Sequence, residues 1–463
     1  MSDATSFARL PLADALLTNL DALGYHAMTP IQARSLPPIL DGHDVIGRGK
    51  TGSGKTAAFG LGLLSRLEIA RLDVQGLVLC PTRELADQVA GELRRLARGL
   101  PNVKVLTLCG GAPFGPQRGS LEHGAHLIVG TPGRVEEHLR KGTLSLEALS
   151  TLVLDEADRM LDMGFKDALE AIIGAAPRDR QTLLFSATYT DAIRPIAESL
   201  MREPVTVEVE STHDSASIRQ HFYRVADEDE RFEALRLLLL THRPGTSVVF
   251  CNTKRETREV AEALCEHGFS ALALHGDLEQ RDRDRTLVLF ANRSASILVA
   301  TDVAARGLDI DALDAVFNYG IARELEVHVH RIGRTGRAGE SGIACTLVGS
   351  KEAFRLEKLG ERLGETFAPE PLPSGRGLDE TPFAPPMATL QIDGGRKQKV
   401  RPGDILGALT GEGGLAGEAV GKIKVLDRST FVAVRREHAE AALDQLAHGK
   451  LKGRSFRARR VRR

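Results

Sequence analysis

The feature that most constrains the fold of this 463-residue chain is a repeated alternation of short apolar runs with helix-like segments. The first region contains the runs 77–80, 103–106, 127–129, 152–154 and 183–185, and the second contains 247–250, 271–274, 297–300, 315–317 and 344–348. Buried parallel strands have this continuous apolar character, because helices cover both faces of their sheet. The pattern predicts an α/β chain with two doubly wound parallel-sheet domains, divided near residues 203–217.

A glycine-rich segment, Gly49-Lys50-Thr51-Gly52-Ser53-Gly54-Lys55-Thr56, fits the phosphate-binding pattern G-x-x-x-x-G-K-[ST]. The glycines permit a tight turn whose N–H groups can point at phosphate oxygens, while Lys55 reaches the β- and γ-phosphates and Thr56 holds Mg²⁺. A short apolar stretch precedes the segment and a helix-like run follows it, as such a loop requires. The loop predicts a bound nucleoside triphosphate; an accidental match in a surface turn is the alternative.

Unusual polar residues follow several of the apolar runs in the first region. The acidic quartet Asp155-Glu156-Ala157-Asp158 follows the run 152–154, and Ser186-Ala187-Thr188 follows the run 183–185. Carboxylates that leave a buried strand are costly unless they have a partner, so a merely solvated acidic helix start is the weaker interpretation. We expect Asp155 to hold Mg²⁺ and Glu156 to polarise the attacking water.

The second region supplies positive charge that could complement the phosphates of a bound nucleotide. The octet His330-Arg331-Ile332-Gly333-Arg334-Thr335-Gly336-Arg337 places three arginines within seven residues, and it follows the polar segment 301–309. An arginine offered to a γ-phosphate across a domain boundary accelerates phosphoryl transfer by roughly 10³–10⁵. A solvated basic face would explain a lone arginine cluster, but the pairing with the segment 301–309 favours a role at the triphosphate.

Together these motifs resemble the DEAD-box family of RNA helicases, in order and in spacing, from about residue 7 to residue 367. The resemblance implies two tandem RecA-like domains and a helicase that uses ATP and Mg²⁺. It assigns adenine recognition to Phe7, Tyr25, Thr29 and Gln32, the ribose to Asp309, the γ-phosphate to Arg334 and Arg337, and the coupling of hydrolysis to domain closure to Asp158, Ser186, Thr188 and His330. Gly49 replaces a frequent Ala and Met28 a frequent Pro, and neither departure puts ATP binding in doubt.

The same resemblance implies an RNA path over both domains, with contacts to phosphates and 2′-hydroxyls rather than to base edges. The contacts expected on the first domain are Thr82, Arg83, Gly110, Gly111, Thr131, Gly133 and Arg134, and those on the second are Asn252, Thr253, Gly276, Thr301 and Arg306. The helicase core should therefore distinguish the type of strand and not its sequence.

A proline-rich stretch at 369–387 predicts a partly extended linker. Beyond it we expect a strand at 389–392, a helix at 401–409, strands at 422–426 and 430–434, a helix at 437–448 and a strand at 455–461. This β-α-β-β-α-β order is typical of the RNA-recognition-motif (RRM) fold. The predicted domains are thus 1–208, 209–368, the linker 369–387, and an α+β RRM-like domain at 388–463. Phe431 is the only aromatic residue on its expected central strand, so RNA binding should depend on Lys and Arg.

The C-terminal region is also basic. Residues 391–463 contain 17 Lys and Arg against 8 Asp and Glu, whereas the whole chain has a formal net charge of −1. This asymmetry indicates contact with a polyanion, although a solvated basic surface or a docking module for a protein partner would share it. The segment with Arg396, Lys397, Lys399 and Arg401 resembles the tail of bacterial DbpA-type helicases. That resemblance implies binding to 23S rRNA near the peptidyl-transferase centre and a role in assembly of the large ribosomal subunit.

Several other classes of protein are disfavoured. No stretch reaches 18 consecutive apolar residues and the N-terminus lacks a signal-peptide pattern, so we expect a cytoplasmic protein without a membrane span. The five cysteines form no C-x-x-C pair, which favours reduced, buried thiols and leaves a zinc site with almost no support. We expect RNA as the partner and no stable protein partner.

The sequence thus predicts RNA-stimulated ATP hydrolysis coupled to local unwinding of RNA duplexes. Two rivals remain, an ATP-gated clamp that holds RNA without unwinding it and a DNA helicase with a similar core. The intact segments 186–188 and 330–337 argue against a clamp that cannot hydrolyse ATP. The acidic quartet and the basic tail argue against a DNA helicase.

Overall fold

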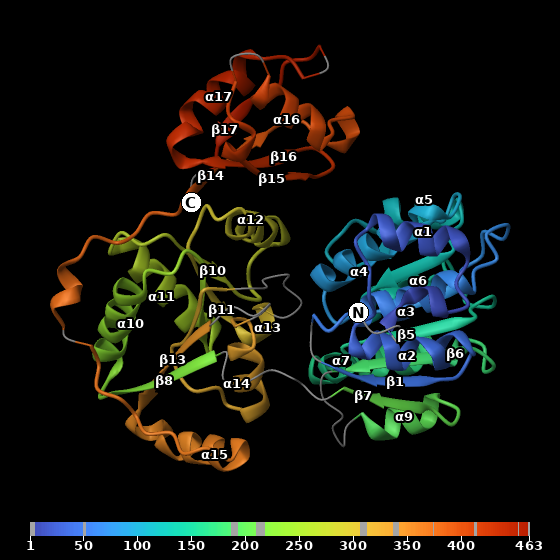
Figure 1. Ribbon diagram of the computed structural model, residues 1–463, viewed down its shortest axis with the longest axis horizontal. Helices are drawn as coiled ribbons and strands as arrows, with labels where there is room; N and C mark the ends of the chain where they lie inside the picture. Colours follow the sequence, from blue (N-terminus) through green and yellow to red (C-terminus); the bar gives the residue numbers. More distant parts are fainter. Residues whose placement is uncertain are drawn as a thin grey trace. The chain divides into compact units, whose positions relative to one another are not determined.

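The described residues fold into two compact units, the first ending at residue 209 and the second beginning at residue 218 (Figure 1). The computed structural model describes residues 5–49, 52–186, 193–209, 218–305, 313–336, 342–373, 375–411, 414–451 and 453–461. Five residues with expected roles, Thr51, Thr188, Arg306, Asp309 and Arg337, lie outside the described residues.

The first unit is built on a seven-stranded sheet with the strand order β3-β4-β2-β5-β6-β1-β7, in which every pairing is parallel. Its strands are β1 (Val45–Arg48), β2 (Gly76–Leu79), β3 (Val105–Leu108), β4 (Leu127–Gly130), β5 (Thr151–Asp155), β6 (Gln181–Ser186) and β7 (Val205–Glu208). Its helices are α1 (Asp14–Ala22), α2 (Pro30–Leu40), α3 (Lys55–Ser65), α4 (Arg83–Leu96), α5 (Phe114–Glu122), α6 (Pro132–Arg140), α7 (Ala157–Asp162), α8 (Lys166–Gly174) and α9 (Arg194–Leu200), with short 3₁₀ turns η2 (Phe7–Arg9) and η3 (Ala97–Gly99).

Helices cover both faces of this sheet because successive strand residues point to opposite sides. In β2 and the residue after it, Val78 and Cys80 pack into the core formed with α1, α2, α3 and α4. Leu77 and Leu79 of the same strand pack into the core formed with α6, α8 and α9. The continuous apolar runs of the sequence are therefore strands with two buried faces, as predicted.

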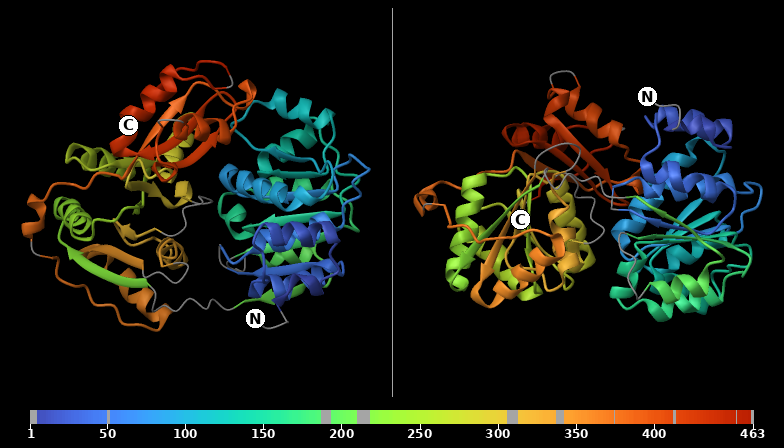
Figure 2. Two further views of the ribbon diagram at one scale, coloured as in Figure 1. Left: turned by 45° about the horizontal axis from the view of Figure 1, so that its top comes forward. Right: turned by 60° about the horizontal axis from the view of Figure 1, so that its bottom comes forward.

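The second unit begins with a six-stranded parallel sheet of order β10-β11-β9-β12-β13-β8 (Figure 2). Its strands are β8 (Ile218–Val225), β9 (Ser247–Cys251), β10 (Ala271–Leu274), β11 (Ile297–Thr301), β12 (Ala315–Asn318) and β13 (Gly342–Gly349). The accompanying helices are α10 (Glu228–His242), α11 (Lys254–Glu266), α12 (Gln280–Ala291), α13 (Asp302–Ala305), α14 (Leu325–Ile332) and α15 (Ala353–Leu363), with the 3₁₀ turns η5 (Ser350–Glu352) and η6 (Gly375–Asp379).

The same unit contains a four-stranded antiparallel sheet of order β15-β16-β14-β17, which we call the C-terminal domain. Its strands are β14 (Met387–Ile392), β15 (Val420–Val425), β16 (Thr430–Arg435) and β17 (Ala458–Arg460). Its helices are α16 (Pro402–Thr410) and α17 (Ala439–His448), with the 3₁₀ turns η7 (Arg396–Gln398), η8 (Gly417–Ala419) and η9 (Arg436–His438). The β-α-β-β-α-β order confirms the predicted α+β class of this region.

Two strands escaped prediction, and one was placed too early. β7 and β8 are edge strands, and their exposed residues interrupt the continuous apolar run that identifies a central strand. The run expected at 103–106 lies at β3, two residues later. Lys104 instead lies just before the strand and is bonded to His126, the residue that precedes β4. The Lys104 N–H donates to Nδ1 of His126, and the Lys104 carbonyl accepts from the His126 N–H.

The cysteines agree with the reduced, buried thiols expected from the sequence. All five cysteines are free thiols, four of them buried, and burial raises the pKa of Cys109 and of Cys345 to about 12. Thiols with such pKa values stay protonated and unreactive at neutral pH. Among the residues described, no helix has both the length and the apolar character needed to cross a membrane.

His328 on α14 is a buried imidazole that should make the second unit sensitive to acid. Its ring stacks on Phe222 with centroids 6.1 Å apart, and neither nitrogen has a hydrogen-bond partner among the described residues. Burial lowers the pKa of His328 to about 4. Between pH 6.5 and 4 the unfolded chain therefore binds a proton that the folded chain does not. As the pH falls through this window, the free energy of unfolding decreases by about 1.4 kcal/mol per pH unit.

We expect His328→Leu to remove this dependence and to leave the protein more stable than wild type at pH 5. Urea unfolding across pH 4.5–7.5 measures it, with His448→Leu, an exposed histidine at the end of α17, as the matched control. An unchanged pH slope in the His328 variant would contradict the assignment.

Candidate active site and RNA-facing loops

The phosphate loop connects β1 to α3 and needs glycine for two reasons. Gly52 and Gly54 have φ values of 83° and 97°, in the left-handed region that other residues rarely adopt. A Cβ on Gly54 would also lie 2.5 Å from Nε2 of Gln32, which leaves no room for a side chain. The N-terminus of α3 follows directly, so its free N–H groups and positive dipole end face the loop.

Two residues expected at the adenine hold this loop from the side. Thr29 caps the N-terminus of α2, and its hydroxyl donates to the Ser53 carbonyl at 2.8 Å. Gln32 is buried and its Nε2 donates to the Gly54 carbonyl at 3.1 Å, while its Oε1 accepts from the Thr29 N–H at 2.9 Å. The structure therefore connects the expected base-recognition residues directly to the loop that would hold the phosphates.

The two aromatic residues expected near the adenine lie together on the same side. Phe7 meets Tyr25 edge to face with ring centroids 6.3 Å apart. The Tyr25 hydroxyl donates to Oε1 of Glu92 at 2.6 Å, and burial together with this carboxylate raises the pKa of Tyr25 to about 12. Phe7 exposes only 5 % of its surface, so it is packed as a core residue in this structure.

The acidic quartet stands at the carboxyl end of β5, two strands from β1 in the sheet. Ser186 ends the intervening strand β6, and its carbonyl accepts from the Gly49 N–H at 3.1 Å. Ligands of parallel sheets bind at this edge, where loops from neighbouring strands converge. The structure thus brings together the phosphate loop, Asp155, Glu156 and Ser186, as predicted from widely separated segments.

Lys55 and the acids form a buried group of opposite charges. Nζ of Lys55 donates to the Gly49 carbonyl at 2.5 Å, and Lys55, Asp155 and Glu156 each expose less than a tenth of their surface. Burial lowers the pKa of Lys55 against the opposing attraction of Asp155 and Glu156. Burial likewise raises the pKa of Asp155 to about 7, and Lys55 only partly offsets the rise.

A divalent cation fits this arrangement. Oδ1 of Asp155 is buried without a hydrogen-bond partner among the described residues, and Thr56 presents its hydroxyl at the start of α3. An unpaired carboxylate oxygen is the kind of ligand that Mg²⁺ prefers. The described part of the chain contains no cluster of three or more His, Cys, Asp or Glu side chains suited to a metal. Mg²⁺ would therefore be held by Asp155 and Thr56 together with the phosphates.

Sequence reasoning missed Arg159, which holds Glu156. Glu156 has a left-handed backbone with φ 54°, and its Oε2 accepts from Nη1 of Arg159 at 2.9 Å. Both side chains are 7 % exposed, so the ion pair is shielded from water. The i,i+3 spacing of Glu156 and Arg159 at the start of α7 was the signal in the sequence that could have revealed this ion pair. Asp158 accepts from the Arg159 N–H at 3.0 Å, so three of these residues form one network.

The raised pKa of Asp155 gives a prediction for stability. The carboxyl of Asp155 gains its proton near pH 7 in the folded chain and near pH 3.8 in the unfolded chain. Ionised Asp155 therefore lowers the free energy of unfolding. This loss is complete above pH 7 and absent well below pH 3.8. We expect Asp155→Asn to stabilise the nucleotide-free protein by about 1–3 kcal/mol at pH 8, with the difference shrinking as the pH falls below 7. Thermal unfolding at several pH values tests this, with exposed Asp179→Asn as control; a destabilised Asp155 variant at pH 8 would refute it.

The RNA-facing residues expected on the first unit lie at the carboxyl ends of three neighbouring strands. Thr82 caps and Arg83 begins α4 after β2, Gly110 and Gly111 follow β3, and Thr131, Gly133 and Arg134 follow β4. Because the strand order is β3-β4-β2, the three loops are adjacent. The Gly110 N–H reaches the Thr131 hydroxyl at 3.5 Å, which connects two of them.

Arg134 is fixed by partners that the sequence did not reveal. Its Nη1 donates to the Ala112 carbonyl at 2.9 Å and to Oε1 of Gln117 at 2.8 Å. Gln117 also donates to the Cys109 carbonyl at 3.1 Å and accepts from buried His138, whose ring stacks on Phe114 at 4.2 Å. These contacts hold the loop after β3 against the loop after β4.

The second unit repeats this arrangement. Asn252 and Thr253 follow β9, Gly276 follows β10, and Thr301 ends β11, and these strands are neighbours in the order β10-β11-β9. Thr253 caps α11 by accepting from the Glu256 N–H at 3.1 Å. The expected RNA contacts that the structure describes on this unit are thus gathered at one edge of its sheet.

Arg331 joins that edge to the arginine-rich helix. Its guanidinium is 1 % exposed and pairs with Asp302 at 2.6 and 2.7 Å, while Nη2 donates to Oδ1 of Asn252 at 2.8 Å. Arg331 therefore cannot reach out to a phosphate as the sequence alone would allow. His330 lies beside it on α14, and Arg334, 8 % exposed, follows the helix.

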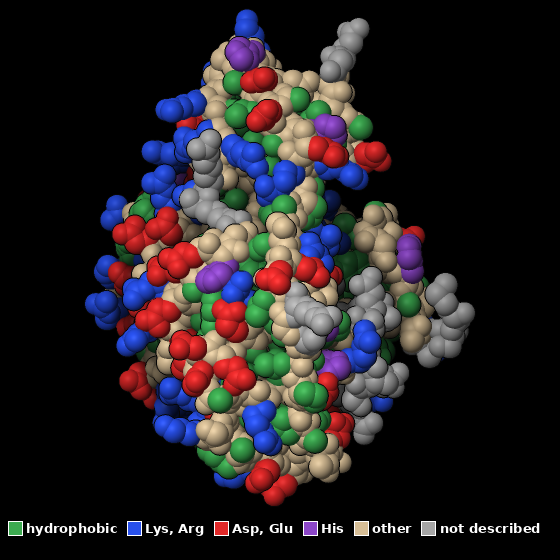
Figure 3. Space-filling model, turned by 90° about the vertical axis from the view of Figure 1, so that its left-hand side faces the viewer, with side chains coloured by type: hydrophobic (Ala, Val, Ile, Leu, Met, Phe, Trp, Pro, Cys, Tyr) green, Lys and Arg blue, Asp and Glu red, His purple; other side chains and the backbone are tan. Residues whose placement is uncertain are grey.

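The basic residues of the C-terminal domain form an exposed turn. Arg396, Lys397, Lys399 and Arg401 are all exposed, and Figure 3 shows Lys and Arg side chains gathered on this domain at the top of the view. The backbone N–H groups of Arg396 and Lys397 donate to the carbonyls of Leu426 and Asp427, at 2.8 and 2.9 Å. Phe431 is only 7 % exposed, so its ring cannot stack on a base.

Three family models match the chain. The DEAD/DEAH box helicase model matches residues 29–196, and the model of the helicase conserved C-terminal domain matches residues 230–339. The DbpA RNA binding domain model matches residues 389–460. The matches cover, in order, the phosphate-loop unit, the second parallel sheet and the C-terminal domain.

Known proteins resemble the chain over most of its length. The ATP-dependent RNA helicase DbpA of Escherichia coli (strain K12) is 56 % identical over 456 residues, which are 98 % of this chain and 99 % of that protein. The DEAD-box ATP-dependent RNA helicase CshA of Geobacillus kaustophilus (strain HTA426) is 44 % identical over 371 residues, covering 80 % of this chain and 79 % of that protein. Among solved structures, S. cerevisiae Dbp5 bound to RNA and ADP BeF3 matches with a TM-score of 0.71 and 31 % identity, covering 80 % of this chain and 96 % of that one.

Proposed function

This chain belongs to the DEAD-box family of ATP-dependent RNA helicases, and from that premise we propose that its C-terminal domain directs the helicase to 23S rRNA in an assembling large ribosomal subunit. The activity itself, RNA-dependent use of ATP, follows from the family. The observation that carries the finer proposal is the match of residues 389–460 to a DbpA RNA binding domain, together with the exposed basic side chains of its turn.

We assign the steps of ATP hydrolysis to the residues around the phosphate loop. The loop N–H groups and Lys55 bind the phosphates, and Gln32, Thr29, Tyr25 and Phe7 select adenine. Glu156, held by Arg159, orients the water that attacks the γ-phosphate. Mg²⁺ held by Asp155 and Thr56 would neutralise charge on the phosphates.

The second unit supplies the remaining groups. Arg334 and Arg337 stabilise charge on the γ-phosphate, and Asp309 binds the ribose. Asp158, Ser186, Thr188 and His330 couple hydrolysis to domain closure. RNA lies along the strand-end loops of both sheets, through phosphate and 2′-hydroxyl contacts that do not depend on sequence. Short duplexes lose a strand when the bound strand is bent.

Attachment to the target RNA then falls to the exposed basic turn of the C-terminal domain, which would meet folded RNA by its shape and charge. Its charged side chains can contact RNA phosphates, and the buried ring of Phe431 leaves base stacking out of the interaction. We place this reaction in the cytoplasm, where ribosomal subunits of bacteria assemble, and we propose no stable protein partner.

We expect the triple variant Arg396→Gln, Lys397→Gln, Lys399→Gln to lose selective stimulation by 23S rRNA. The concentration of a 23S rRNA fragment that gives half-maximal ATP hydrolysis should rise at least tenfold, because about three phosphate contacts are removed. Stimulation by poly(A) at saturating concentration should remain, since the helicase core is intact.

The control variant Lys351→Gln, Lys358→Gln, Arg362→Gln removes the same charge from exposed residues in and before α15. It should keep the preference for 23S rRNA. If both variants lose the preference for 23S rRNA equally, the loss comes from total positive charge and not from the basic turn. An unchanged preference in the first variant would disprove the role of the basic turn.

A further inference from the structure

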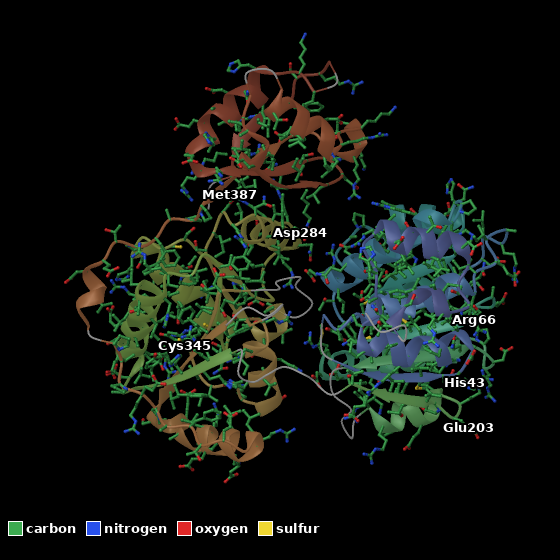
Figure 4. All side chains as sticks on the ribbon, in the orientation of Figure 1. His43, Arg66, Glu203, Asp284, Cys345 and Met387 are labelled. Carbon is green, nitrogen blue, oxygen red and sulfur yellow. The ribbon has the colours of Figure 1, made fainter. Side chains whose placement is uncertain are left out.

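A pocket between α10 and α11 has no role in the ATP site or in the basic turn. Its volume is about 780 Å³, within the range of small-molecule sites in proteins. Figure 1 shows the two helices side by side on the second parallel sheet, whose core they share. Figure 4 labels Cys345, whose Sγ lies 3.8 Å from Nε2 of His242 at the end of α10. The pocket lies toward the opposite, N-terminal end of that helix.

The walls of the pocket are acidic. Five carboxylates line it, and Arg255 is the only cation among the described residues of its lining. The carboxylates come from both helices: Glu228, Asp229 and Glu233 on α10, and Glu256 and Glu259 on α11. Figure 3, which views the molecule from the side of α10, shows Asp and Glu side chains gathered there. The lining therefore attracts cations.

Neighbouring arginines compensate only part of this charge. Three of the carboxylates have an arginine partner: Glu228 with Arg231, Glu233 with Arg236, and Glu259 with Arg255. Asp229 and Glu256 have no ion-pair partner among the residues that the structure describes. The Arg255 side chain is 81 % exposed, so its ion pair contributes little free energy and a bound cation can replace it.

A buried tyrosine adds a polar atom that has no partner. Tyr319 follows β12, lines the pocket and is only 5 % exposed, yet its hydroxyl makes no hydrogen bond within the described parts of the chain. Burial raises the pKa of Tyr319, and the carboxylates of Glu228 and Glu256 raise it further. The hydroxyl therefore lies close to acidic groups of both walls. A polar atom in this position needs a partner from outside the chain.

Apolar groups occupy the space between the carboxylates. Phe232 is half-buried and its ring meets His267 with centroids 5.4 Å apart, while Val260 lines the wall formed by α11. The lining residues of α11 extend from Thr253 to Ala263, about 15 Å along the helix axis. The pocket is thus an elongated groove that offers carboxylates at intervals and apolar surface between them.

We propose that this groove binds an aliphatic polyamine, a linear cation whose ammonium groups are separated by short methylene chains. The ammonium groups pair with the carboxylates of the two helices, and one of them donates to the Tyr319 hydroxyl. The methylene chains pack on Phe232 and Val260, as the stem of a lysine packs on apolar surface.

Other cationic ligands fit the groove less well. A metal ion would leave the apolar wall unused, and the residues described include no cluster of acidic, His or Cys side chains suited to one. A basic segment of a protein partner would share the charge, but a specific protein interface needs about 800 Å² from each side, more than such a groove offers. A polyamine uses both the charge and the apolar surface.

The groove adjoins the loop after β9. Glu256 accepts from the Asn252 N–H at 2.8 Å, and Thr253 itself lines the groove. Both are expected RNA contacts. A bound polyamine therefore neutralises carboxylates that would otherwise repel RNA phosphates at this edge of the sheet. This consequence rests on the RNA contacts proposed above, whereas polyamine binding does not.

The experiment is isothermal titration calorimetry of the full chain with spermidine, at physiological ionic strength and without nucleotide or RNA. We expect one site per chain. Tyr319→Phe keeps the ring and removes the hydroxyl, so it should raise the dissociation constant about tenfold. Asp229→Asn combined with Glu259→Gln removes two carboxylates and should raise it at least about tenfold.

The control variant Glu262→Gln, Glu266→Gln removes the same charge from exposed residues of α11 outside the groove. It should bind spermidine as the wild type does. Absence of binding to the wild type, equal weakening in the control, or displacement by an equal concentration of Mg²⁺ would overturn the proposal. If the Asp229 and Glu259 variant fails to fold, Tyr319→Phe decides, and wild-type affinity in Tyr319→Phe also overturns it.

Binding to poly(A) without spermidine tests the effect on RNA separately. The Asp229→Asn, Glu259→Gln variant should bind poly(A) at least about twofold more tightly than the Glu262→Gln, Glu266→Gln control, because its missing charges lie beside the RNA edge. Equal affinities would exclude the effect on RNA. The calorimetry uses neither RNA nor ATP, so its result is independent of the role proposed for 23S rRNA.

Discussion

The burial of Lys55 beside two carboxylates is the interaction on which the catalytic unit depends. Its ammonium group is held by the Gly49 carbonyl at 2.5 Å and shares a dry site with Asp155 and Glu156. Charges removed from water are costly unless they are mutually compensated. Burial raises the pKa of Asp155 to about 7, because the attraction of Lys55 offsets only part of the cost of the ionised carboxylate. The site is thus prepared for a ligand that brings phosphates and a cation together.

The parallel sheets place the residues expected to bind nucleotide and those expected to bind RNA at the carboxyl ends of their strands. In the first unit, the carboxyl ends of β1, β5 and β6 lie at the expected phosphate site, and the loops after β2, β3 and β4 gather the residues expected to meet RNA. The second unit gathers its expected RNA contacts after β9, β10 and β11. Two side chains outside the sheets, half-buried Gln117 on α5 and buried Arg331 on α14, hold neighbouring loops in place.

Sequence patterns identified the central strands, because an apolar run is a local signal, and the motifs with expected catalytic roles follow those strands in the structure. The edge strands β7 and β8 have no such run and were missed. Arg159, His138 and Gln117 were missed because their roles depend on partners that only folding supplies. The proline-rich composition of residues 369–387 suggested a linker, and Leu372, Leu378 and Phe383, which attach it to α10 and α11, carried no recognisable pattern.

The central claim is that hydrolysis of ATP needs the carboxylate of Glu156, placed by β5 and Arg159 beside the phosphate loop. The most direct measurement is RNA-stimulated ATP hydrolysis by Glu156→Gln at saturating ATP and RNA, together with ATP-dependent RNA binding by the same variant. We predict that turnover falls at least a hundredfold while RNA binding remains, since the amide keeps the shape but cannot accept a proton. Turnover within a few fold of wild type would contradict the account.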